Sequence, residues 1–123
     1  MTTRVLDIGN CSPDHASIRS LLETSFGAEV VQSHGLKDAL EQLANQSFTL
    51  ILVNRKLDRD YSDGLDVIKQ IKACEEFAQT PIMMITNFAE HQAKAVESGA
   101  LSGFGKLELA SQETQEKLAA VLA

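Results

Sequence analysis

The sequence predicts an α/β fold, in which a five-stranded parallel sheet is covered by helices on both faces. Short apolar runs of strand length alternate five times with segments of helical periodicity, and one run is apolar almost throughout, as in a strand buried on both faces. Alternation at this spacing requires crossover connections, which make the sheet parallel. The 123 residues suit one compact domain, and we expect residues 1–123 to form it.

The first two strand–helix units are predicted from residues 4–44. Arg4–Ile8 is a short β-type run, and the following residues predict a helix with Ser12 as its N-cap and Pro13 at its first position. Gly27 ends this helical pattern, as a left-handed C-cap would. The second strand is expected at 29–32. The second helix is expected over Leu36, Ala39, Leu40, Leu43 and Ala44.

The third unit begins with the apolar run. Phe48–Asn54 is predicted to be the central and most buried strand. A polar loop follows over residues 55–63. The next helix is expected to begin at Gly64 and to end near Cys74.

The last two units complete the sheet. Pro81–Thr86 is predicted as a strand, with proline at its first residue, where the sheet needs no hydrogen-bond donor. Helix is expected at 89–98 and strand at 101–105. A closing helix is expected to bury Leu118, Val121 and Leu122.

Composition narrows the class of function. The chain has 17 acidic and 11 basic residues, a formal charge of -6 and no tryptophan, which disfavours direct binding of nucleic acids or anionic membranes. We expect a cytoplasmic protein, because the N-terminus lacks the pattern of a signal peptide and no apolar run reaches the ~18 residues of a membrane span. Cys11 and Cys74 lie far apart in sequence and do not indicate a disulfide framework.

Candidate site residues follow from the strand prediction. In an open parallel sheet, ligands bind where the carboxyl ends of the strands meet, here called the carboxyl edge. Five positions of this sequence fall there: Gly9, Asn10, Asn54, Thr86 and Lys106.

The chain resembles the receiver domain of two-component response regulators, as found in chemotaxis receivers. The residues that carry the resemblance are the apolar strand ending at Asn54, the downstream Asp63-Gly64 pair, the 81–86 strand, Gly99-Ala100, and Lys106 six residues beyond Ala100. The resemblance covers essentially the whole chain. It implies the flavodoxin-like (βα)5 fold with strand order 2-1-3-4-5.

In that family an acidic pair after the first strand helps to hold Mg²⁺, an aspartate ending the third strand accepts the phosphoryl group, and Thr or Ser and Lys contact the phosphate. Thr86 and Lys106 match this pattern, whereas Asn54, Gly9 and Asn10 replace the three acids. Mg²⁺ prefers carboxylate oxygens, and a neutral amide is no anionic nucleophile. The resemblance therefore implies a degenerate receiver, or pseudo-receiver, without a cofactor or enzymatic activity.

Three further positions depart from the family. Gly103 stands where the family has an aromatic residue that turns inward upon phosphorylation, whereas Phe104 is expected to pack in the core on the other side of the sheet. Leu107 replaces the usual proline, which disfavours a cis peptide there. For Lys106 two interpretations remain open: a hydrogen bond to Asn54, or extension into solvent.

The loop over residues 55–63 is about two residues longer than in the family and is a candidate for a new binding feature. Asp58, Asp60 and Ser62 match the first ligand positions of a calcium loop, but Asp63 and Lys69 do not fit the later ones, and calcium binding is not expected. The remaining polar candidates are expected to have no role in a site. They are the three histidines, His15, His34 and His91, predicted at the surface, and Cys11, predicted as a half-buried apolar residue.

The leading hypothesis is phosphorylation-independent binding of a signalling protein, such as a histidine kinase or an output domain. The surface expected to bind it comprises the fourth helix, fifth strand and fifth helix, with Phe88, Val96 and Leu101 as apolar anchors. An alternative is a receiver that still responds to phosphoryl groups, metal or another small ligand through Asp58, Asp60 or Asp63. A flavin carrier is disfavoured, because no phosphate-binding loop follows the first strand. The oligomeric state stays open.

Overall fold

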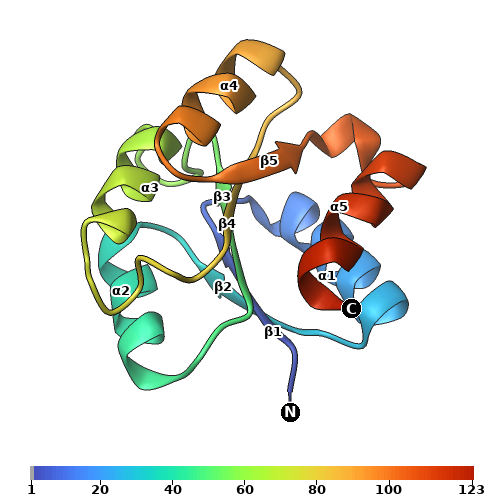
Figure 1. Cartoon of the computed structure of the whole chain (residues 1–123), viewed down its shortest axis with the longest axis horizontal. Helices are drawn as coiled ribbons and strands as arrows, with labels where there is room; N and C mark the ends of the chain where they lie inside the picture. Colours follow the sequence, from blue (N-terminus) through green and yellow to red (C-terminus); the bar gives the residue numbers. More distant parts are fainter. Residues whose placement is uncertain (1) are drawn as a thin grey trace.

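The computed structural model describes residues 2–123. Within these residues, five strands alternate with five α-helices and a short 3₁₀-helix, η1, precedes the last α-helix (Figure 1). In chain order the elements are β1 (Arg4–Ile8), α1 (Ser12–Phe26), β2 (Glu29–Ser33), α2 (Leu36–Asn45), β3 (Leu50–Asn54), α3 (Gly64–Lys72), β4 (Ile82–Ile85), α4 (Ala89–Glu97), β5 (Leu101–Phe104), η1 (Lys106–Glu108) and α5 (Gln112–Leu122).

All neighbouring strands pair in parallel, in the order β2-β1-β3-β4-β5, which confirms the predicted sheet. β3 lies at the centre, and its first four residues are fully buried, as the apolar run predicts. The pairing of β4 with β5 is irregular: Met83 pairs with Leu101 and Ile85 with Phe104, so that β5 carries one extra residue between the two pairs.

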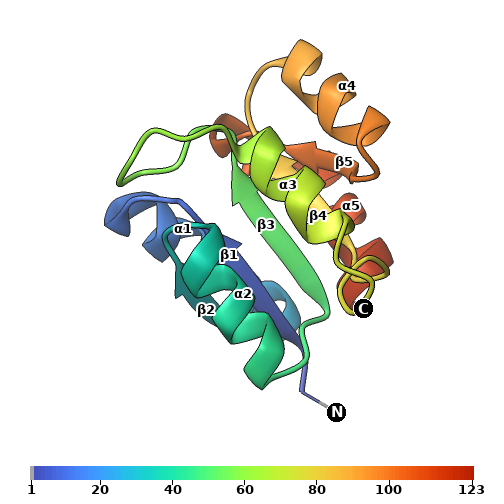
Figure 2. The ribbon, with the colours of Figure 1, turned by 90° about the vertical axis from the view of Figure 1, so that its left-hand side faces the viewer.

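Helices cover both faces of the sheet. α1 and α5 lie on one face, whereas α2 and α3 lie on the other, and α4 lies beside the β5 edge (Figures 1 and 2). Alternate residues of β3 point to opposite faces, because side chains alternate along a strand. Leu52 accordingly belongs to the core cluster of α1 and α5, and Ile51 to the cluster of α2 and α3.

The predicted boundaries differ from the structure at a few ends. The first helix begins at Ser12, and Cys11 is its N-cap, so that Pro13 occupies the second helical position. Both positions tolerate proline, because the first N–H groups of a helix have no partner within it. β3 begins at Leu50 rather than at Phe48, and β4 excludes Pro81, whose carbonyl nevertheless accepts from Ile51 N. No helix within residues 2–123 is long and apolar enough to cross a membrane.

Candidate functional site

Three of the five predicted site positions line one small pocket at the carboxyl edge. The pocket has a volume of about 150 Å³, and Asn54, Thr86 and Lys106 contribute to its wall. Arg55 and Lys56 add two further cations. No carboxylate lines this pocket, so the groups around it are neutral or positively charged. Gly9 and Asn10 do not line it, although both follow β1 at the same edge.

Asn54 ends β3, and its side chain is tied to neighbouring backbone. Its Nδ2 donates to the carbonyl of Lys56 at 2.8 Å and to the carbonyl of Gly9 at 3.3 Å. These are the bonds expected of a strand-end amide that satisfies loop carbonyls. The Asn54 amide therefore fixes the start of the 55–63 loop and links β3 to the end of β1.

Gly9 is covered by the long loop that follows β3. Its φ of +79° lies in the left-handed region, and a β-carbon at this position would overlap the side chain of Leu57. Leu57 is 1% exposed, and the next residue, Asp58, donates its N–H to the Gly9 carbonyl at 3.0 Å. The space beside Gly9 is thus filled by an apolar side chain that belongs to the core.

Asp7 is a site residue that the sequence analysis missed. It lies inside β1, is fully buried, and accepts from Asn10 Nδ2 at 2.6 Å, while His15 Nδ1 lies 2.7 Å from its other oxygen. Burial raises the pKa of Asp7, although the contacts with His15 and Asn10 oppose that shift. A charged residue within the apolar run Arg4–Ile8 was the signal that could have identified it.

Two predictions near this carboxylate were wrong. His15 is not a plain surface residue, because its pairing with Asp7 leaves its side chain only 13% exposed. Cys11 is exposed rather than half-buried, since it forms the N-cap of α1, where its Sγ contacts Asp14 Oδ2 at 3.2 Å. In both cases the local path of the chain at the start of α1 determines the environment.

Lys106 follows neither of its two predicted interpretations. Its Nζ lies 2.7 Å from Oδ2 of Asp14, in the first turn of α1, and both side chains are partly exposed. The hydrogen bond from Lys106 is the main cause that lowers the pKa of the Asp14 carboxyl. The lysine is therefore drawn toward α1 rather than toward Asn54.

Thr86 follows β4 at the carboxyl edge, and Gly103 and Phe104 are the last two residues of β5. Thr86 is almost buried, and its hydroxyl accepts from Phe88 N at 3.3 Å. Phe104 is 3% exposed and packs in the cluster of α1 and α5, as predicted. Gly103 has no room for a side chain, because a β-carbon would overlap the carbonyl oxygen of Met84. All peptide bonds of the described chain are trans, including that before Leu107.

The acids of the long loop do not converge. Asp60 accepts from Ser62 N, and Asp63 caps α3 by accepting from Leu65 N. Asp58 lies 3.3 Å from His34 Nδ1, so the half-buried His34 is not a plain surface residue either. Among residues 2–123, no group of three or more His, Cys, Asp or Glu side chains is placed to hold a metal ion.

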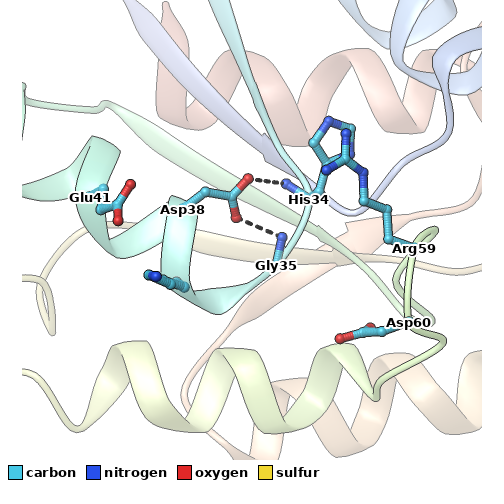
Figure 3. Close-up of a pocket in the computed structure, with 7 residues that line it drawn as sticks. His34, Gly35, Asp38, Glu41, Arg59 and Asp60 are labelled. Carbon is cyan, nitrogen blue, oxygen red and sulfur yellow. Dashed lines mark hydrogen bonds between the residues drawn. The ribbon is translucent and has the colours of Figure 1, made fainter.

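The same loop helps to form a second pocket, between itself and α2. The pocket has a volume of about 430 Å³ and is lined by Arg59 and Asp60 of the loop together with His34, Gly35 and residues of α2. In Figure 3 the Arg59 side chain extends toward His34, whereas Asp60 lies apart from the turn. Asp38 holds this turn by accepting from the backbone N–H groups of both turn residues. Burial alone would raise the pKa of Asp38, but the hydrogen bonds from the backbone of His34, Gly35 and Asp38, together with a Coulombic contribution from His34, outweigh burial and lower it.

The predicted partner surface is exposed. Phe88 is 58% exposed at the N-cap of α4, Val96 is 46% exposed near its end, and Leu101 is 44% exposed at the start of β5. Beside them, a pocket of about 290 Å³ lies between α4, β5 and α5, with Gln92 and Lys117 in its wall. We call this surface the α4–β5–α5 face.

Comparison with known proteins agrees with this architecture. Residues 13–113 match the family described as the response regulator receiver domain. The chain is 30% identical over 87 residues to the transcriptional regulatory protein ZraR of Escherichia coli (strain K12); the match covers 71% of this chain but only 19% of ZraR. The chain thus corresponds to about a fifth of that relative's length.

Solved structures show the same fold at low sequence identity. A sensor protein from Polaromonas sp. JS666 has a TM-score of 0.83 at 17% identity, covering 98% of this chain and 95% of that one. Chemotaxis response regulator CheY4 of Vibrio cholerae has a TM-score of 0.76 at 20% identity, covering 99% and 100%. The chain therefore belongs to the response regulator receiver domain family, whose members are signalling modules of two-component systems that interact with kinases or output domains.

Proposed function

We propose that this chain, as a single receiver domain over residues 1–123, acts by binding a signalling partner, without phosphorylation and without catalysis. The observation that carries the proposal is the state of Asn54. Its neutral amide stands at the strand-end position where the family has its phosphoryl acceptor, and its Nδ2 donates to two loop carbonyls. An amide held in this way offers no anionic oxygen to attack a phosphoryl donor.

The surroundings of β1 do not fit the Mg²⁺ ion that the family implies. A hydrated Mg²⁺ needs carboxylate ligands and room for its waters. Leu57 fills the space at Gly9. Asn10 is fully buried, and its side-chain amide donates a hydrogen bond to Asp7. Asp7 itself is buried and is shared between Asn10 and His15. These contacts support a domain that works without the metal.

Asn54→Asp tests the loss of phosphorylation. The variant is incubated with acetyl phosphate and Mg²⁺, and phosphorylation is followed by intact mass, with wild-type protein as the matched control. We expect no added phosphate on either protein, because the variant still has Gly9 and Asn10 where the metal-binding acids belong. Phosphorylation of the variant would show that the β1 loop holds the metal in another way.

The partner-binding half of the proposal rests on the exposure of Phe88, Val96 and Leu101. Wild-type protein and a Phe88→Ser variant are used to capture partners from the native source. Tyr61→Ser is the matched control, because Tyr61 is also an exposed aromatic residue, 72% exposed, but lies on the long loop. We expect a protein captured by wild type and by Tyr61→Ser to be lost with Phe88→Ser. Equal capture by all three proteins would reject the α4–β5–α5 face as the docking surface.

A second candidate function is a response to a small ligand in the pocket at Asn54. Asp58 and Asp60, which would have supplied carboxylates, have partners elsewhere, whereas Arg55, Lys56 and Lys106 line the pocket. This lining favours an anion over a cation. Separate NMR titrations with inorganic phosphate and with MgCl₂ distinguish an anion site from a cation site. Saturable shifts at Asn54, Thr86 and Lys106 with phosphate would support this candidate, and flat titrations would reject it.

A further inference from the structure

Two glycines of the β5 region each lie close to a side-chain amide from the α4 region. A β-carbon at Gly103 would overlap the Met84 carbonyl and come within 3.2 Å of Gln92 Oε1. A β-carbon at Gly105 would overlap the side chain of Asn87. Asn87 lies in the segment that leads into α4, and Gln92 lies within α4. Gly105 thus leaves room for the Asn87 amide, which reaches the backbone of η1, and Gly103 lies beside the Gln92 amide, which reaches the backbone of β5.

Gln92 bridges β4 and β5 where their pairing is irregular. Its Nε2 donates to the carbonyls of Met84 at 2.9 Å and Thr86 at 3.3 Å, and its Oε1 accepts from Gly103 N at 2.8 Å. β5 carries one extra residue here, between the pairs Met83–Leu101 and Ile85–Phe104, and Gly103 is one of the two residues that lie between these pairs. The Gln92 amide therefore links the backbones of β4 and β5 through its own hydrogen bonds at the point where their pairing is irregular.

Asn87 makes a second connection, four residues further along β5 and η1. Its Oδ1 accepts from Leu107 N at 3.1 Å, and the same side chain occupies the space that a β-carbon at Gly105 would need. From the other side, Lys117 of α5 donates its Nζ to the Gly103 carbonyl at 2.9 Å. Gly103 is consequently held through its N–H by α4 and through its carbonyl by α5.

We propose that Gln92 and Asn87 are positioning residues that clamp α4 onto β5 and the segment preceding α4 onto η1, and so keep the α4–β5–α5 face in one conformation. The clamp uses side-chain amides, whose hydrogen bonds do not depend on a phosphoryl group or on a change of charge near neutral pH. It also borders the pocket of about 290 Å³ on that face, where Gln92, Gly103 and Lys117 form part of the wall. The inference concerns the isolated chain and does not depend on the proposed partner binding.

Amide hydrogen exchange tests the two connections separately, because Gln92 protects the N–H of Gly103 and Asn87 protects that of Leu107. Gln92→Ala is expected to accelerate exchange at Gly103 about tenfold, and Asn87→Ala to do the same at Leu107, as for loss of a single hydrogen bond. Gln70→Ala is the matched control, since Gln70 is an exposed glutamine of α3. Unchanged exchange at Leu52 verifies that the core of each variant is intact. Unchanged exchange at Gly103 in Gln92→Ala would overturn the role of Gln92.

Gln92→Glu gives a second test in which the side chain keeps its size. Its carboxylate can still accept from Gly103 N, but it places negative charge against the carbonyls of Met84 and Thr86. NMR relaxation dispersion should detect no exchange on the microsecond-to-millisecond scale over residues 86–104 of the wild type, and clear exchange there in the variant. Dispersion over these residues in the wild type would overturn the single conformation, even if every variant failed to fold.

Discussion

The two halves of the carboxyl edge are closed by different kinds of contact. At the end of β1, Gly9 is covered by Leu57, an apolar side chain that belongs to the main core. At the end of β5, Gly105 is covered by the amide side chain of Asn87 and Gly103 lies beside that of Gln92, and both amides hydrogen-bond to the backbone. In both halves a glycine lies beside a neighbouring side chain, but one neighbour packs in the apolar core and the other hydrogen-bonds to the backbone.

This difference should separate global stability from local motion. A buried leucine contributes to the free energy of unfolding of the whole domain, because its removal leaves a cavity in a close-packed core. A side-chain hydrogen bond at the sheet edge contributes only about 1 kcal/mol, and its loss permits opening of the adjacent segment. Substitutions near β1 should therefore lower global stability most, and those near β5 should mainly change dynamics.

The largest expected effect is that of Gly9→Asp, which places an acid where the family has one. The new side chain must adopt a φ of +79° and displace Leu57, so the free energy of unfolding should fall by roughly 3 to 4 kcal/mol. Urea denaturation measures the change. Stability equal to that of the wild type would show that Leu57 moves aside easily and that the two halves are alike.

Leu57→Ala should destabilise the domain by about 3 kcal/mol, because Leu57 is 1% exposed and belongs to the core cluster. Gly9→Ala should itself be destabilising, since its β-carbon meets Leu57. In the double variant the alanine at residue 9 enters the space that Leu57 vacates, so the combined loss should be smaller than the sum of the single losses. Additive losses in urea denaturation would contradict the contact.

The sequence predicts the fold better than the contacts at its edge. Five periodic units predict β1 to β5 and the strand end at Asn54, because periodicity reflects burial along each element. The predicted end of β4 at Thr86 lies one residue beyond the observed end at Ile85. Leu57 lay in a segment interpreted as a polar loop, and its burial depends on the path of that loop over β1. The partner of Lys106 likewise depends on where the first turn of α1 lies relative to the β5 end.

Asp7 and Gln92 were missed for different reasons. Asp7 stands in an apolar strand, and strand alternation places it on the same face as Val5, but its burial requires His15 from the next helix. Gln92 appears as an ordinary polar residue of a weakly apolar helix, and its bond to Gly103 lies where β5 carries an extra residue, which the sequence pattern does not reveal. Polar contacts between distant segments follow from tertiary geometry rather than from periodicity.

Asp7→Asn should alter the pH dependence of stability more than stability itself. The substitution keeps volume and exchanges one buried hydrogen bond, so the variant should lie within about 2 kcal/mol of the wild type at pH 7. Burial raises the pKa of Asp7 above its ordinary value of 3.8, so the native state binds this proton more tightly than the unfolded state. Wild-type stability relative to the variant should then rise as pH falls through the raised pKa, and level off below 3.8. Urea denaturation across this range checks the sign, and a falling difference would contradict it.

Lys106→Met should have the smallest effect, although Lys106 joins the two halves by pairing with Asp14. Both side chains are about a third exposed, so the pair should contribute no more than about 0.5 kcal/mol, and less at high salt. The pairing lowers the pKa of Asp14 below 3.8, so its contribution is present above 3.8 and is lost as pH falls through the lowered value, opposite in sign to that of Asp7. NMR titration of the Asp14 carboxyl should show its pKa returning toward 3.8 in Lys106→Met but not in Arg19→Met, because Arg19 pairs with Glu23 instead. An unchanged Asp14 titration in Lys106→Met would contradict the ion pair as a connection between the two halves.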